Sequence, residues 1–101
     1  MRPRRVRFTA TAQRQVAHEK TWWLENRLHI DVFATEIDEA VRMLSLLPGA
    51  GTPYAAAGTR GLRRLYLRGI ACHVYYTFDA HDVIVRAVWG ARRVRRPLLE
   101  A

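Results

Sequence analysis

The sequence predicts an α+β fold in which an antiparallel helical hairpin packs on one face of a mainly antiparallel sheet. Three observations support this class: a short alternating segment opens the chain, two segments with helical spacing follow, and three alternating segments fill the last third. Period-two alternation is typical of half-buried strands, whereas apolar residues three and four apart indicate helices that cover a core. The predicted order is β-α-α-β-β-β, in one domain over residues 1–101.

The first predicted elements are a strand and a helix. Residues 4–8 alternate as a short strand. Thr9 or Thr11 can cap the following helix, because a threonine oxygen accepts a hydrogen bond from a free backbone N–H. Apolar residues then recur at helical spacing from residue 12 to about residue 27. A strand that leads directly into an amphipathic helix is therefore expected at the start of the chain.

A second helix and a long loop come next. Asp31 is a good N-cap for a helix that ends near residue 47, where Pro48 and Gly49 stop it. The short connection between the two helices favours an antiparallel pair. Residues 48–61 have no periodicity and are rich in Gly, Ala, Pro and Thr, so they predict a loop, and loops of this length are often functional.

Three strands are predicted over 63–68, 72–78 and 83–89, and alternation assigns their faces. The positions expected to face the helices are Leu65, Leu67, Cys72, Val74, Tyr76, Phe78, Val83, Val85, Ala87 and Trp89. The positions expected on the opposite face are Arg64, Tyr66, Arg68, His73, Tyr75, Thr77, Ile84, Arg86 and Val88. The second set predicts a cationic and aromatic sheet surface that is open to a ligand.

Charge is strongly positive and unevenly placed. The chain carries 17 Lys and Arg against 9 Asp and Glu, a net charge of +8. No carboxylate occurs between residues 40 and 78, and arginines gather there and in a basic tail over about 90–101. Such a field attracts polyanions or an acidic peptide, although a run of charge is also compatible with a simple solvated face.

Cysteine use and hydropathy indicate a compartment. Cys72 is the single cysteine, so an internal disulfide is excluded and a reducing compartment is expected. No stretch approaches the roughly 20 apolar residues of a membrane span. The basic start of the chain is followed by polar residues instead of an apolar signal core. We therefore expect a cytoplasmic protein without membrane contact.

Most familiar chemistry is excluded. The glycines at 49 and 51 are not followed by the Gly-Lys-Ser/Thr of a phosphate loop, and the four histidines and Cys72 have no zinc-ligand spacing. No metal or cofactor is expected. One constellation remains: Arg64, Arg68 and Arg92 can hold a phosphodiester while His73 moves a proton near neutral pH. Alternatively, the same face packs against a partner chain.

Three segments in a fixed order carry a family resemblance. They are Gly61-Leu62-Arg63-Arg64-Leu65-Tyr66-Leu67-Arg68, His73-Val74-Tyr75-Tyr76 and Ala87-Val88-Trp89-Gly90-Ala91-Arg92-Arg93. Together with Trp22-Trp23-Leu24-x-Asn26-Arg27 on the first helix, this pattern resembles the RelE/ParE superfamily of bacterial toxin components over essentially the whole chain. The resemblance implies the toxin of a type II toxin-antitoxin pair, bound and neutralised by a cognate protein antitoxin.

The resemblance also implies contact residues. The expected antitoxin contacts are Trp22, Arg63, Arg68 and Tyr75. The expected contacts with the cellular target or a nucleic acid are Arg64, Tyr66, Arg68, Tyr75, Arg86, Arg92 and Arg93. An antitoxin segment that bears acidic and apolar residues would suit a surface of this charge.

Two branches of the superfamily imply different targets. A RelE-like member would be a ribosome-dependent mRNA endoribonuclease, with Arg64, His73 and Arg92 as its catalytic residues. A ParE-like member would inhibit DNA gyrase and replication without catalysis. The ParE-like branch is favoured here because the chain departs from the ribonuclease branch at two positions. Tyr66 stands where those members usually have a basic residue, and Leu98 stands near the position where some of them have a tyrosine. A basic nucleic-acid-binding domain without toxicity is the third hypothesis.

Overall fold

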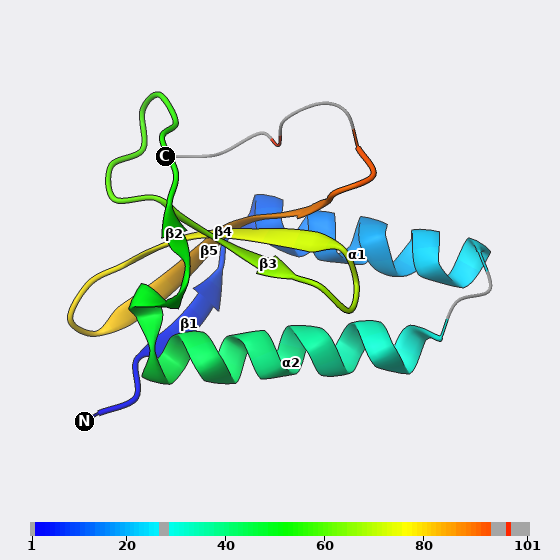
Figure 1. Cartoon of the computed structure of the whole chain (residues 1–101), viewed down its shortest axis with the longest axis horizontal. Coiled ribbons are helices and arrows are strands. Elements are labelled where there is room, and N and C mark those ends of the chain that lie inside the picture. The colour runs from blue at the N-terminus through cyan, green and yellow to red at the C-terminus, as the bar shows by residue number, and fades with distance from the viewer. Residues whose placement is uncertain (1, 27–28, 94–96, 98–101) are drawn as a thin grey trace.

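The described part of the chain forms two layers, with helices α1 and α2 on one face of a five-stranded sheet (Figure 1). The computed structural model describes residues 2–26, 29–93 and 97. The elements are β1 (Arg5–Phe8), α1 (Ala10–Glu25), α2 (Ile30–Leu46), the short 3-10 helix η1 (Pro48–Ala50), β2 (Thr52–Pro53), β3 (Arg63–Leu67), β4 (Cys72–Phe78) and β5 (Asp82–Gly90). The strand order is β1-β5-β4-β3-β2. Among the described residues only the β1–β5 pair is parallel, so the predicted α+β class and mainly antiparallel sheet are confirmed.

The two helices begin differently. The Thr9 hydroxyl accepts a hydrogen bond from the Ala12 N–H at 3.1 Å, which confirms the predicted cap of α1. The predicted cap of α2 is wrong: His29 is its N-cap and makes no side-chain cap bond, and Asp31 lies in the first turn. A carboxylate in the first turn still stabilises the helix, because its negative charge is attracted to the positive N-terminal end of the helix dipole.

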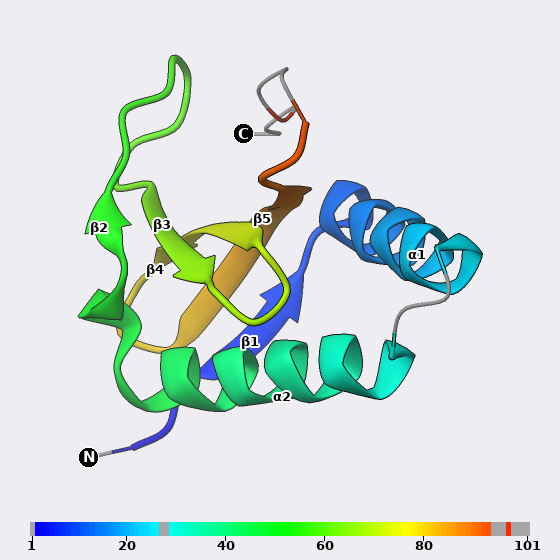
Figure 2. The same cartoon turned by 45° about the vertical axis from the view of Figure 1, so that its right-hand side comes forward.

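The core lies between the helices and the sheet. Both helices lie on the same side of the strands, and the loop between β2 and β3 projects away from α2 (Figure 2). The buried core residues are Ala12, Phe33, Ala40, Leu44, Leu67, Ile70, Cys72, Val74, Tyr76, Val83, Val85 and Val88. Trp23 packs against this cluster, with its ring centroid 5.9 Å from that of Phe33.

A β-bulge in β5 changes which residues face the helices. Tyr75 pairs with Ala87 and Tyr76 pairs with Val85, so Arg86 is an extra residue in β5. An extra residue reverses the alternation beyond it. Val88 therefore lies in the helix-side core, whereas Ala87 and Trp89 lie on the opposite face. The predicted orientation of these three residues was wrong, although Val83 and Val85 face the core as predicted.

Helix α1 closes the edge of β5 beyond the end of β1. Strand β1 pairs with β5 only as far as Val85. The Thr9 N–H then donates to the Val85 carbonyl at 3.0 Å, and the Gln15 Oε1 accepts from the Val88 N–H at 2.8 Å. A helix side chain thus takes the place of a neighbouring strand, which satisfies a backbone donor that would otherwise have no partner in the sheet.

The first half of the loop after α2 is anchored by Tyr76. Its hydroxyl is fully buried, donates to the Pro48 carbonyl at 2.6 Å and accepts from the Gly51 N–H at 2.8 Å. A Cβ on Gly51 would lie 2.7 Å from that hydroxyl, so the close approach requires glycine. Arg63 adds a hydrogen bond from Nε to the Gly51 carbonyl at 3.0 Å. The segment predicted as loop therefore contains η1 and β2, both fixed to the sheet.

Candidate functional site

The sheet face away from the helices carries two rows of side chains. Pairing between strands places Arg64, Tyr75 and Ala87 in one row, and Tyr66, His73 and Trp89 in the next. The second half of the loop covers the first row: Tyr54, Ala56 and Leu62 pack with Tyr75, Ala87 and Trp89 in a small separate cluster. We call this sheet surface the outer face.

Tyr75 is buried on the outer face. Its side chain is only 3% exposed, and the Tyr54 ring meets it edge-on with centroids 5.0 Å apart. Burial raises the pKa of its hydroxyl, and the nearby Arg64 guanidinium acts in the opposite direction. The expectation that Tyr75 stands open to bind bases or an antitoxin was wrong for this conformation, because Tyr54 and Leu62 cover it.

His73 lies between aromatic rings in the second row. Its ring centroid is 4.9 Å from that of Tyr66 and 6.2 Å from that of Tyr75. Its Nδ1 is buried without a hydrogen-bond partner among the described residues. Burial lowers the pKa of His73, and the positive charge of Arg64 lowers it further. A neutral imidazole is therefore favoured near pH 7, which suits proton acceptance or stacking.

The remaining residues predicted on this face differ in how free they are. Tyr66 is 48% exposed and Arg68 is exposed. The Arg64 guanidinium lies 5.0 Å from the centre of the Tyr54 ring, in cation–π geometry. The Arg86 Nε donates to the Thr77 hydroxyl at 3.0 Å. Tyr66 and Arg68 are therefore the groups of this set most open to a ligand.

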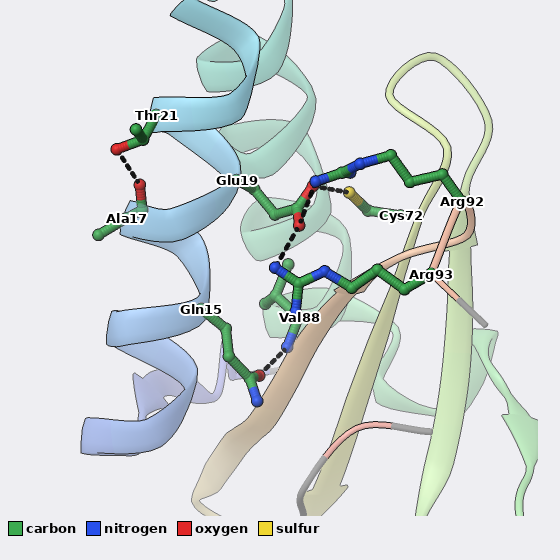
Figure 3. Close-up of polar contacts among 8 residues, drawn as sticks. All are labelled: Gln15, Ala17, Glu19, Thr21, Cys72, Val88, Arg92 and Arg93. Carbon is green, nitrogen blue, oxygen red and sulfur yellow. Dashed lines mark hydrogen bonds and ion pairs between the residues drawn. The ribbon is translucent and has the colours of Figure 1, made fainter. Parts of the chain in front are cut away.

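A buried carboxylate organises the other side of the sheet (Figure 3). Glu19 of α1 is only 1% exposed. Its two oxygens accept hydrogen bonds from Arg92 Nη1 at 2.6 Å and Nη2 at 3.2 Å, and Arg93 Nη2 lies 3.4 Å from Oε2. A charged side chain is buried only when it is paired, and here two guanidiniums share one carboxylate. We call Glu19, Arg92 and Arg93 the Glu19 cluster.

Cys72 and Gly90 adjoin the Glu19 cluster. The Cys72 thiol donates to Glu19 Oε1 at 3.9 Å, and burial, with the adjacent Glu19 charge, raises its pKa to about 12. A Cβ on Gly90 would clash with the Arg92 guanidinium and would lie 3.0 Å from Glu19 Oε1. Glycine at this position therefore leaves room for the Arg92 side chain to return to α1.

Sequence reasoning missed Glu19 as a site residue, although the sequence contains a signal. Ala12, Val16, Glu19 and Trp23 follow one another at spacings of four, three and four, which is one face of a helix. Ala12 is buried in the core, and Val16 and Trp23 pack against it. A glutamate on the apolar stripe of a helix predicts a buried partner of opposite charge.

The structure separates residues that were predicted to act together. Arg64 lies beside His73 on the outer face, but Arg92 lies on the helix side, with its guanidinium 3.9 Å from the centre of the Trp22 ring. Arg64, His73 and Arg92 therefore form no single site here. Arg93 stacks on Trp89 at 4.1 Å.

The residues predicted to contact the antitoxin also lie in different parts of the structure. Trp22 and Arg68 line one hollow, whereas Arg63 binds the carbonyls of Gly49 and Gly51 and Tyr75 is buried. Most of the predicted basic tail, including Leu98, lies outside the described residues. Its described part, residues 90–93 and 97, includes both arginines of the Glu19 cluster.

Two kinds of feature are absent from the described residues. No group of three or more His, Cys, Asp or Glu in that part of the chain could hold a metal ion. None of the helices in residues 2–26 and 29–93 is long and apolar enough to cross a membrane.

Comparisons with known proteins relate the chain to toxin-antitoxin structures. No protein-family model matches the sequence, and no curated protein matches it. A chain of the chromosomal ParDE TA system from P. aeruginosa matches with a TM-score of 0.67 at 13% identity, covering 88% of this chain and 97% of that one. This likeness concerns the fold alone.

A second solved structure is more similar in sequence. A chain of the toxin-antitoxin complex RelBE2 from Mycobacterium tuberculosis matches with a TM-score of 0.62 at 26% identity, covering 90% of this chain and 95% of that one. Both matches span nearly the full length of the proteins compared, in agreement with a sequence resemblance that extends over essentially the whole chain. The arrangement of two helices on a β1-β5-β4-β3-β2 sheet, together with these matches, places the chain in the RelE/ParE superfamily.

Proposed function

We propose that this chain is the toxin of a type II toxin-antitoxin module and is neutralised by a cognate protein antitoxin. Support comes from its superfamily and from its likeness to a chain of the toxin-antitoxin complex RelBE2. The net charge of +8 supports an acidic binding partner. The exposed Arg68 and the half-buried Trp22 provide a cation and an aromatic surface for such a partner.

We further propose a ParE-like action on DNA gyrase and replication, without catalysis. One observation carries this choice: Arg92 is held by Glu19 and Trp22 on the helix side, while His73 lies on the outer face. A metal-free ribonuclease needs its phosphate-binding cations and its proton-transfer group around one scissile bond. An arginine bound to a buried carboxylate is poorly placed for that task.

A ribosome-dependent mRNA endoribonuclease is the second candidate. It is favoured by the proximity of Arg64 to His73, whose Nδ1 is buried and without a partner among the described residues. Under this hypothesis Arg64 binds phosphate, His73 transfers the proton and Tyr66 stacks on a base. Its requirement for a second cation would have to be met by Arg68 or by a group of the ribosome.

Growth experiments test the proposed role. The chain is induced alone and together with the gene beside it. Growth arrest that the neighbouring gene relieves is the expected result. Absence of arrest, or arrest that the neighbour does not relieve, would reject the toxin proposal and favour a non-toxic nucleic-acid-binding domain.

Two readouts distinguish the targets. Loss of gyrase supercoiling with the purified chain supports the ParE-like proposal, whereas transcript cleavage at ribosomes supports the ribonuclease. The variant His73→Ala sharpens the comparison, since a general acid or base contributes about 10²-fold or more to rate. Arg60→Ala, at an exposed loop position, is the control. Toxicity that survives His73→Ala unchanged would remove His73 from the mechanism.

A further inference from the structure

A hollow between three distant parts of the chain contains Trp22 and Arg68, the two residues offered above as a surface for the partner. Its lining comes from the end of α1, the turn between β3 and β4 and the segment after β5. The lining residues are Trp22, Trp23, Arg68, Gly69, Ile70, Ala71 and Arg92, around a volume of about 250 Å³. We call it the Trp22 pocket. Its size suits one large apolar side chain.

The walls of the Trp22 pocket are fixed before any ligand binds. Trp23 packs against Phe33 in the core, and Ile70 in the turn is buried. The Trp22 indole is covered on one side by the Arg92 guanidinium, which Glu19 holds through two hydrogen bonds. A pocket with fixed walls loses little conformational freedom when it binds, which favours affinity.

The surroundings of the pocket are positively charged. Glu19 is shared between Arg92 and Arg93, so this cluster keeps an excess of one positive charge. Arg68 is exposed at the pocket and has no carboxylate partner among the described residues. Glu36 of α2 lies near Gly69, which lines the pocket, and offsets part of this charge. The excess remains positive, so an anionic ligand is favoured.

We propose that the Trp22 pocket receives an apolar side chain of the antitoxin that stands next to a carboxylate. This inference rests on the proposed function. The apolar side chain would contact the indoles of Trp22 and Trp23, and the carboxylate would bind Arg68. A buried aromatic group surrounded by polar contacts is the usual form of an energetic hot spot. The charge complementarity selects an acidic and apolar segment over a basic or purely polar one.

Binding measurements test this inference with the product of the neighbouring gene as the probe. We expect Trp22→Ala to weaken its affinity about 30-fold or more, as truncation of a hot-spot tryptophan does. Arg68→Glu should weaken it about tenfold or more, because the reversed charge repels the carboxylate. Arg42→Glu is the matched control, with the same change at an exposed position of α2, and should bind like the wild type.

A fluorine signal on Trp22 provides a readout that folding defects do not imitate. The wild-type chain is labelled with 5-fluorotryptophan, and the Trp22 resonance is assigned with Trp22→Phe. Saturation with the probe should shift that resonance. Unchanged affinity for Trp22→Ala and Arg68→Glu, or an unmoved Trp22 resonance at saturation, would overturn the pocket assignment while leaving the toxin proposal intact. A probe that fails to bind the wild-type chain would overturn both.

Discussion

Replacement of Glu19 by glutamine tests whether the buried carboxylate holds the segment after β5. The change preserves side-chain size but removes the charge that Arg92 and Arg93 share. Breaking a buried ion pair by removing one partner costs about 3–5 kcal/mol. Here the side chains of Arg92 and Arg93 are 33% and 20% exposed and their guanidiniums can regain water, so we expect a smaller loss of about 2–3 kcal/mol.

Chemical denaturation measures this loss directly, because small globular proteins normally unfold in one step. A loss of about 2–3 kcal/mol would also lower Tm by about 10 °C or more. Glu25→Gln is the control: it makes the same change at an exposed position of α1 and should stay within about 0.5 kcal/mol of the wild type. Equal stability of Glu19→Gln and wild type would refute the idea that Glu19 holds the arginines.

Three further predictions concern other buried groups. Tyr76→Phe should cost about 2 kcal/mol in denaturation, because the Pro48 carbonyl and the Gly51 N–H would lose their buried partner; no loss would refute this. The His73 pKa is lowered in the folded chain, so as the pH falls the unfolded chain binds a proton at a higher pH than the folded chain does. Stability should therefore fall as the pH drops below about 6.5, and it should fall less in His73→Asn. Because its pKa is about 12, the Cys72 thiol should resist iodoacetamide at pH 8 until the chain unfolds, and rapid alkylation of the folded chain would contradict this. The contribution of Cys72 to stability should decline as the pH rises above about 9, where the thiol of the unfolded chain ionises.

Much of the fold follows from the sequence because its elements depend on local patterns. The alternating strands, the amphipathic helices and the Thr9 cap are all properties of short segments. The bulge at Arg86 is different, since it depends on which β4 residue pairs with each β5 residue. The alternation of 83–89 contains no sign of it. The faces of Ala87, Val88 and Trp89 were therefore assigned incorrectly.

The candidate site was less predictable because it depends on contacts between distant segments. Tyr75 was expected to be open, but Tyr54 from a loop without periodicity covers it. Arg92 was grouped with His73 by charge and motif, yet Glu19, 73 residues earlier, holds it on the other side of the sheet. The net charge of a sequence does not reveal such an ion pair, since a buried carboxylate and a surface carboxylate count equally in it.

The contact between Gln15 and β5 has a consequence for self-association. Beyond Val85, no strand in the described part of the chain pairs with β5 on its β1 side, and an open strand edge invites pairing with a strand of another molecule. Thr9 and Gln15 use two of the backbone groups on that edge, and α1 stands in the way of an incoming strand. The opposite edge strand, β2, is two residues long and contains Pro53, which cannot donate a ladder hydrogen bond. Gln15 thus protects this edge of β5 from strand pairing and also helps to dock α1.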